Sequence, residues 1–256
     1  VTPYKNVNKF LEDFLFQVKK ILGDKLVGLY LYGSLTWEDF DIDISDIDLL
    51  AVLSVDLNEN EALALEKMHK DIIRDYKQWE GRIDVQYLSE EGLKTYKSKT
   101  SKMARIASGY PFQVIDAGLD WIMNWYFVLD NGVILFGPKP SKFIDPISKQ
   151  EFFQSVKDQA KWWKMNLAKT EKDRPYQSYV ILTMCRALYS VKNKGEQVSK
   201  IKASKWVKEQ LPEHSDLIDE ALLWRKNSKN RKIAHELTYS KTREFVLLLI
   251  DQITKA

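Results

Sequence analysis

The first half of the chain places its apolar residues at helical spacing in some stretches and in continuous or alternating runs in others. Helical spacing predicts amphipathic helices, nearly continuous apolar runs predict strands buried on both faces, and strict alternation predicts a half-buried strand. In chain order the pattern predicts a helix at 7–22, buried strands at 26–32 and 47–53, a helix at 58–79 and a half-buried strand at 82–88. The first half is therefore predicted to form an α/β unit.

The second half loses its strands, apart from one short extended piece at 133–138. A helix is predicted from Ala117 to Asp130, and Ser148 with Glu151 forms a capping box that opens another. Further helices are predicted from Pro175 to about Asn193 and at 204–210, 215–224 and 240–255. We therefore expect two domains, an α/β domain over 1–145 and an all-α domain over 146–256.

The composition is that of an ordinary globular protein, with 45% hydrophobic and 29% charged residues among 256. The formal charge of +3 is too small to indicate a general nucleic-acid binder. The single cysteine, Cys185, excludes an internal disulfide and, with only three histidines, a Cys/His zinc site. No apolar run reaches transmembrane length and no signal-peptide pattern is visible, so we expect a cytoplasmic protein that does not act at a membrane. The sequence is silent on oligomeric state.

The residues with the most evident chemical potential are carboxylates clustered in one acidic stretch. Six carboxylates fall within eleven residues: Glu38, Asp39, Asp41, Asp43, Asp46 and Asp48. Like charges this close repel one another unless solvent or a cation relieves them. A solvated loop is one interpretation. A calcium-binding EF-hand loop is excluded, because Ile44 stands at its glycine position and Leu50 at its bidentate glutamate position.

A third interpretation uses the geometry of a strand. Asp46 and Asp48 flank Ile47 at the start of a predicted strand, so alternation aims both carboxylates at one face. Asp84 is the polar-face residue of another predicted strand, and three carboxylates converge if the two strands are neighbours. Such a set suits Mg²⁺, which prefers oxygen ligands and substrate phosphates. The preceding turn at 33–34 would let a phosphate approach the backbone closely.

These residues resemble a known signature. Gly33 and Ser34, followed by the segment 45–49 with its aspartate pair, are similar to the DNA polymerase β-like nucleotidyltransferase superfamily. The segments 135–146 and 180–190 resemble the streptomycin/spectinomycin (3″ and 9) aminoglycoside adenylyltransferases. In patches, the resemblance covers most of 25–225. It implies an α/β nucleotidyltransferase fold, with a small mixed sheet and helices, followed by a C-terminal all-α helical domain.

The resemblance also implies roles for individual residues. Asp46, Asp48 and Asp84 would hold two Mg²⁺ ions, with Asp84 also acting as general base. The family has glutamate at that third position, so Asp84 is one methylene shorter and reaches less far toward a substrate hydroxyl. The expected nucleotide contacts are Gly33, Ser34, Ser45, Asp120, Arg186, Lys200 and Trp224. Structural roles stay open for three of them: a turn residue at 45, a helix-surface acid at 120 and a core tryptophan at 224.

The function that the resemblance implies is Mg²⁺-dependent transfer of AMP from ATP to a hydroxyl of an aminoglycoside or aminocyclitol antibiotic, with release of pyrophosphate. The acceptor is expected to be small, hydroxyl-bearing and cationic, and to meet ATP between the two domains. Two alternatives remain open, an enzyme that adenylylates a protein side chain and an antitoxin-type binding protein on the same scaffold. A polynucleotide-tailing enzyme is disfavoured by the weak net charge.

Overall fold

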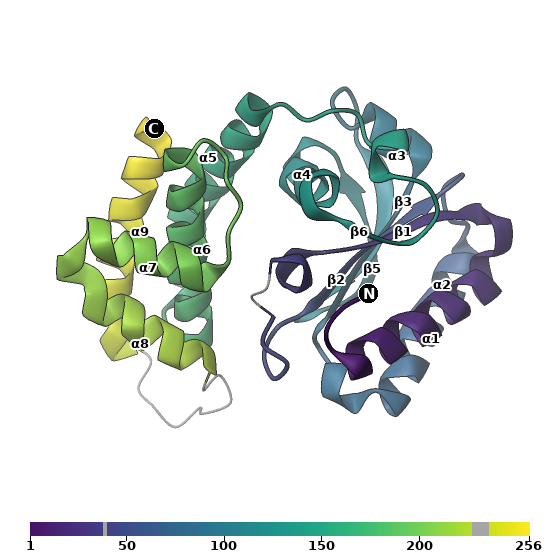
Figure 1. The fold of residues 1–256 in the computed structure, drawn as a ribbon, viewed down its shortest axis with the longest axis horizontal. Coiled ribbons are helices and arrows are strands. Elements are labelled where there is room, and N and C mark those ends of the chain that lie inside the picture. The colour runs from purple at the N-terminus through teal and green to yellow at the C-terminus, as the bar shows by residue number, and fades with distance from the viewer. Residues whose placement is uncertain (38–39, 227–235) are drawn as a thin grey trace. The chain divides into compact units, whose positions relative to one another are not determined.

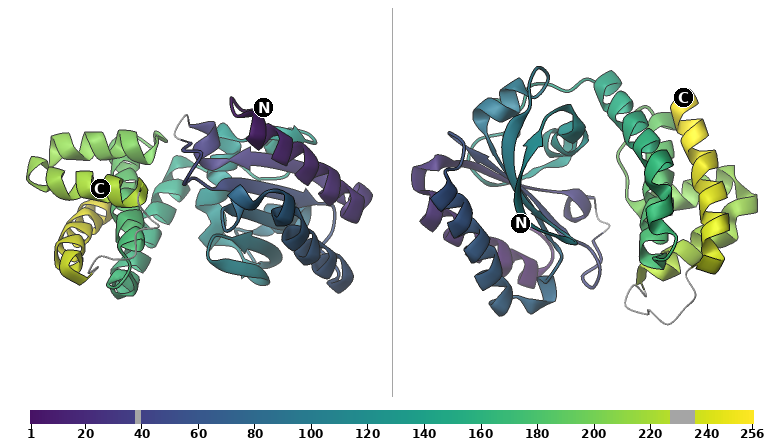
Figure 2. Two further views of the ribbon diagram at one scale, coloured as in Figure 1. Left: turned by 90° about the horizontal axis from the view of Figure 1, so that it is seen from below. Right: turned by 180° about the vertical axis from the view of Figure 1, so that it is seen from behind.

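A computed structural model describes residues 1–37, 40–226 and 236–256, so Glu38 and Asp39 of the acidic stretch lie outside the described residues. The chain divides into two compact units, Val1–Ile147 and Ser148–Ala256. The sequence predicts a domain boundary after residue 145, and the division of roles between the two parts stays a prediction. Figures 1 and 2 show the ribbon of each unit.

The first unit is built on a six-stranded mixed sheet, as the predicted fold requires. Its strands are β1 (Leu26–Tyr32), β2 (Ile47–Leu53), β3 (Ile83–Ser89), β4 (Ser101–Ala107), β5 (Tyr110–Ala117) and β6 (Val133–Phe136). The order across the sheet is β5-β4-β3-β2-β1-β6, and β2 runs parallel to β3 while every other neighbouring pair is antiparallel. The predicted strands at 26–32 and 47–53 form with the predicted bounds.

Helices cover both faces of this sheet (Figure 1). They are α1 (Lys5–Leu22), α2 (Glu59–Asp75), α3 (Glu90–Thr95) and α4 (Ile122–Asn131). The apolar faces of α1 and α2 pack on one side of the sheet, where Phe10 and Phe14 join Leu29, Leu49 and Val85 in a fully buried core. α4 packs against β1. Burial of this much aromatic and aliphatic surface is the main stabilising contribution to the unit.

The hairpin formed by β4 and β5 was not predicted from the sequence. In β4 the adjacent residues Met103 and Ala104 are both buried, and β5 is mostly exposed, so neither strand shows strict alternation. The helix predicted from Ala117 is a further correction. Ala117 ends β5, a 3₁₀ turn spans Leu119–Trp121, and α4 begins only at Ile122.

The second unit is entirely helical in its described residues, which confirms the expected all-α region. Its helices are α5 (Lys149–Asn166), α6 (Arg174–Lys192), α7 (Lys200–Gln210), α8 (Ser215–Lys226) and α9 (Glu236–Lys255). The predicted capping box of Ser148 and Glu151 opens α5. α6 packs against all four other helices, and most of its residues are buried. Among the helices described in either unit, none is long and apolar enough to span a membrane.

Candidate active site

Asp48 and Asp84 stand next to each other on the two parallel strands. The register of β2 and β3 pairs Asp48 with Asp84, and Tyr32 at the end of β1 is paired with Asp48 from the other side. Paired residues share a face of the sheet, because side chains alternate along each strand. Leu49 and Val85 belong to the core under α1 and α2, so the two carboxylates lie on the opposite face. The convergence predicted for these two aspartates is therefore present.

The turn after β1 brings backbone against one of these carboxylates. Gly33 has φ +76°, in the left-handed region that favours glycine, and begins a 3₁₀ turn that ends at Thr36. A Cβ atom on Gly33 would overlap the carboxylate of Asp48. Ser34 follows in the same turn, so the predicted phosphate-binding pair, Gly33 and Ser34, lies directly beside Asp48. Only glycine allows this close approach without displacing the carboxylate.

A buried hydrogen-bond network lies next to the two carboxylates. The Tyr32 hydroxyl accepts hydrogen bonds from Gln86 Nε2 at 2.6 Å and from Asn124 Nδ2 at 3.2 Å. Burial, together with the negative charges of Asp84 and Asp48, raises the pKa of Tyr32 well above its ordinary value. The phenol therefore stays neutral and holds β1, β3 and α4 together beside the carboxylates.

Asp84 is the most perturbed carboxylate of the site. Burial raises the pKa of Asp84 to about 6; the Arg105 guanidinium opposes that rise, and the charge of Asp46 adds to it. Its Oδ1 atom is buried and has no hydrogen-bond partner. A buried acceptor without a partner is costly. Asp84 is thus an acceptor that a ligand or cation could satisfy, and perturbed carboxyl groups of this kind are common at functional sites.

The acidic loop before β2 is held by hydrogen bonds to its own backbone and to Arg82. Arg82 Nη1 donates to the carbonyl oxygens of Ile42 at 3.0 Å and Ser45 at 3.2 Å. Ser45 is 4% exposed, and its hydroxyl accepts a hydrogen bond of 3.0 Å from the Asp41 amide. The turn role left open for Ser45 is therefore real, and its predicted nucleotide contact stays a prediction.

The predicted metal centre of Asp46, Asp48 and Asp84 stays a prediction. Within residues 1–37, 40–226 and 236–256, no group of three or more His, Cys, Asp or Glu side chains is arranged to hold a metal ion. The neighbouring carboxylates of Asp48 and Asp84, with the partnerless Oδ1 of Asp84, nevertheless offer the oxygen donors that Mg²⁺ prefers. This pair fits a magnesium ion, and the participation of Asp46 stays a prediction.

The next three predicted nucleotide contacts lie outside the strands that carry Asp48 and Asp84. Asp120 is exposed in the first unit, and its Oδ1 accepts a hydrogen bond of 2.9 Å from the Gly118 amide. Arg186 is partly exposed in a stretch of α6 whose neighbours are buried, and Lys200 begins α7 with its ammonium 4.2 Å from the centre of the Tyr179 ring. Helices α6 and α7 pack together, so these two cations belong to one helical pair.

Trp224 lies on α8 and is partly buried, so it is not the plain core residue left open from the sequence. The guanidinium carbon of Arg174 lies 5.0 Å from the centre of its ring. Cations at this distance are attracted to the face of an aromatic ring. The stacking of Trp224 on adenine stays a prediction.

Sequence reasoning missed several residues that shape the site, above all Tyr32, Gln86 and Arg105. Tyr32 and Gln86 were part of predicted strands, but nothing in the pattern distinguishes a polar partner from a core residue. Arg105 belongs to the strand that was not predicted. The available signal was an arginine on the polar face of a strand that neighbours the strand of Asp84.

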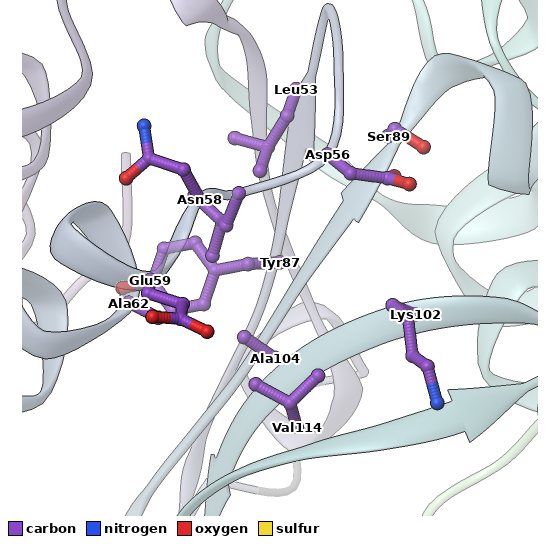
Figure 3. Close-up of a pocket in the computed structure, with 11 residues that line it drawn as sticks. Leu53, Asp56, Asn58, Glu59, Ala62, Tyr87, Ser89, Lys102, Ala104 and Val114 are labelled. Atoms are coloured by element: carbon purple, nitrogen blue, oxygen red, sulfur yellow. The ribbon is translucent and has the colours of Figure 1, made fainter.

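One cavity lies on the opposite face of the sheet, at the start of α2 (Figure 3). It has a volume of about 270 Å³ and a largely apolar floor that includes Leu53, Tyr87, Ala104 and Val114. Lys102 lies at its edge, in an ion pair of 2.8 Å with Asp116. None of the predicted site residues lines this cavity.

Comparison with solved structures identifies the fold. The crystal structure of spectinomycin adenyltransferase AAD(9) from Enterococcus faecialis, solved with ATP and spectinomycin, matches 96% of this chain and 98% of its own, with a TM-score of 0.74 and 20% sequence identity. At this identity the likeness shows the fold, which is that of a nucleotidyltransferase, as predicted. No curated protein sequence gives a significant match.

The helical part of the chain also resembles a known family. Residues 142–252 match the family described as aminoglycoside adenylyltransferase, C-terminal domain. Together with the fold, this match identifies the chain as an enzyme of the nucleotidyltransferase class, similar to the aminoglycoside adenylyltransferases. The resemblance inferred from the sequence motifs is confirmed.

Proposed function

We propose that this enzyme transfers AMP from ATP to a hydroxyl group of an aminoglycoside or aminocyclitol antibiotic, with Mg²⁺, and releases pyrophosphate. The observation that carries the proposal is the in-register pair of Asp48 and Asp84 beside the turn at Gly33. Support also comes from the family match of the helical unit and from the ATP and spectinomycin bound in the solved relative.

In this proposal the carboxylates of Asp48 and Asp84, with Asp46, hold magnesium. Bound there, the metal would supply positive charge to the triphosphate. Gly33 and Ser34 let the phosphates approach the backbone closely, because the glycine leaves no side chain in the way. For the helical unit we propose that Arg186, Lys200 and Trp224 bind the nucleotide, the two cations through phosphate oxygens and the indole through the base.

The transfer itself needs a base at the acceptor hydroxyl. The Asp84 carboxylate takes the hydroxyl proton as the acceptor oxygen forms a bond to the α-phosphorus of ATP. The bond from that phosphorus to the pyrophosphate oxygen breaks in the same displacement. General-base assistance of this kind contributes about 10²- to 10⁴-fold to rates. Asp84 is suited to the role because its Oδ1 has no hydrogen-bond partner in the protein.

Pyrophosphate release from Mg-ATP, measured across aminoglycosides and spectinomycin with mass spectrometry of the acceptors, tests the proposal. We expect release only with an acceptor that gains the mass of AMP. Asp84→Asn should lower transfer by about 10²- to 10⁴-fold, and Asp48→Asn should abolish it. Asp43→Asn is the matched control, because Asp43 is an exposed aspartate of the same loop and should retain activity.

Two results would contradict the proposal. ATP-dependent labelling of protein bands without any small acceptor would indicate an enzyme that adenylylates proteins. Full activity of Asp48→Asn would exclude the site built on β2 and β3, whatever the acceptor.

A further inference from the structure

Arg105 lies on the same face of the sheet as the two site carboxylates. The register pairs Arg105 on β4 with Gln86 on β3, and Gln86 is two residues from Asp84 along its strand. Alternation therefore places Arg105 on the face of Asp84, and its charge is felt there, because it opposes the rise in the pKa of Asp84.

Two aromatic rings contact the guanidinium of Arg105, and Asp84 is the carboxylate that its charge acts on. The central carbon of the guanidinium lies 5.0 Å from the centre of the Trp121 ring and 5.6 Å from that of Tyr110. Its Nε atom is buried without a hydrogen-bond partner. In the part of the chain that the structure describes, no carboxylate lies within ion-pair distance of it, whereas Lys102 on the same strand pairs with Asp116 at 2.8 Å. A half-buried cation kept in place at such a cost calls for a functional explanation.

The strand order shows on which side of the site this charge lies. The turn at Gly33 follows β1, Asp48 is on β2, Asp84 is on β3 and Arg105 is on β4, in that spatial order. In the proposed function the phosphates bind at the Gly33 turn and the acceptor hydroxyl meets Asp84. The acceptor then enters from the side of β4, where Arg105 stands with its two rings.

We propose that Arg105 is a specificity-determining residue for the acceptor, a conclusion that rests on the proposed function. Its fixed charge, which Asp84 offsets only in part, disfavours acceptors more strongly the more positive charge they carry. It favours a compact aminocyclitol such as spectinomycin, with two ammonium groups, over streptomycin, which carries two guanidinium groups and one ammonium group. Like charges brought together in a partly buried site repel strongly, so one arginine is sufficient to discriminate between the two.

The test compares two acceptors of different charge in the full-length protein. We would measure kcat/KM for AMP transfer to spectinomycin and to the more highly charged streptomycin. The wild type should prefer spectinomycin. Arg105→Gln should raise the streptomycin-to-spectinomycin ratio of kcat/KM about tenfold or more, whereas Arg105→Lys, which keeps the charge, should leave the ratio close to that of the wild type.

Lys102→Gln is the matched control. It also removes one positive charge from β4, but Lys102 lies at the edge of the cavity on the opposite face (Figure 3) and should not change the ratio. Circular dichroism checks that each variant is folded. If Arg105→Gln does not fold, Arg105→Met takes its place, because the methionine chain still packs between the two rings.

The possible results distinguish a failure of the role proposed for Arg105 from a failure of the proposed function. A wild type that prefers streptomycin, or a ratio unchanged in Arg105→Gln and Arg105→Met, overturns the role of Arg105 and leaves the transfer reaction intact. An equal change in Lys102→Gln also overturns it, since net charge alone would then explain the effect. A wild type that transfers AMP to neither drug overturns the proposed function, and the inference with it.

Discussion

The side-chain amide of Gln86 donates a hydrogen bond of 2.6 Å to the hydroxyl of Tyr32, across the strand that carries Asp48. Tyr32→Phe would leave this buried donor, and that of Asn124, without an acceptor. We expect the free energy of unfolding to fall by about 1–3 kcal/mol, as measured by urea denaturation. Tyr110→Phe is the control, because Tyr110 is 59% exposed and its change should be within about 0.5 kcal/mol. Equal stability of Tyr32→Phe and the wild type would contradict this role of the network.

Gly33→Ala should damage both stability and activity, for separate reasons. The positive φ of Gly33 strains any other residue by about 1–2 kcal/mol. In addition, the new Cβ overlaps the Asp48 carboxylate and must displace it. Gly81→Ala offers a matched control, since Gly81 has φ +68° and open space around the added Cβ.

Both alanine variants should lose stability to backbone strain in chemical denaturation, Gly33→Ala more so because of the overlap, but only Gly33→Ala should lose most of its AMP transfer under conditions where it is folded. Comparable transfer rates in the two variants would show that the close approach of Gly33 to Asp48 is dispensable.

His69 should make the fold sensitive to mild acid. Burial lowers its pKa from 6.5 to about 3, and its Nε2 lies 2.9 Å from the Tyr87 hydroxyl. Between these pKa values the unfolded chain binds a proton that the folded protein excludes, so stability falls as pH drops below 6.5. The expected slope is about 1.4 kcal/mol per pH unit from this residue.

Urea denaturation of the wild type and of His69→Gln at about pH 7 and about pH 5 measures this contribution. The glutamine variant does not titrate there, so it should lose about 2 kcal/mol less than the wild type over that interval. Parallel losses in the two proteins would mean that His69 is already protonated in the folded state or is not buried.

Tyr179 should hold the Lys200 ammonium in position for the nucleotide. The ammonium lies 4.2 Å from the ring centre, and such contacts at exposed sites contribute about 0.5–1 kcal/mol. Tyr179→Leu should raise the KM for ATP about two- to fivefold with little change in kcat, while Tyr179→Phe keeps the ring and the affinity. Trp162→Leu removes a similar contact, that of Lys169 at 5.5 Å, and should leave KM unchanged. A raised KM in the phenylalanine variant would point to the hydroxyl instead of the ring.

The strands that hold the carboxylates could be predicted because burial imposes a strong pattern on them. The strand of Asp48 is apolar on both faces after its first residues. The sequence of β3 alternates at Ile83–Gln86, but every residue from Val85 to Ser89 is buried, so the strand predicted to be half-buried is covered on both faces. The β4–β5 hairpin could not be predicted for the opposite reason. It lies at the edge of the sheet, where half-exposed positions such as Val114 at 53% do not need to alternate.

The candidate site, like the sheet, could be predicted from the sequence only in part. Spacing could place Asp46 and Asp48 near the start of one strand, but the pairing of Asp48 with Asp84 depends on which strands are neighbours, and a single sequence does not specify this. The aromatic rings around Arg105 come from a hairpin end and a separate 3₁₀ turn. Contacts between such distant segments leave no local pattern, so tertiary packing alone reveals them.

The parallel pairing of β2 with β3 has a consequence for how the enzyme becomes active. Asp48 and Asp84 are 36 residues apart along the chain, with α2 between them, and neither strand contains both carboxylates. Contacts of such sequence separation form late, because the loop that they close must lose its conformational freedom first. During refolding, catalytic activity should therefore return only when β2, α2 and β3 have docked together. The helical circular dichroism signal can return before that.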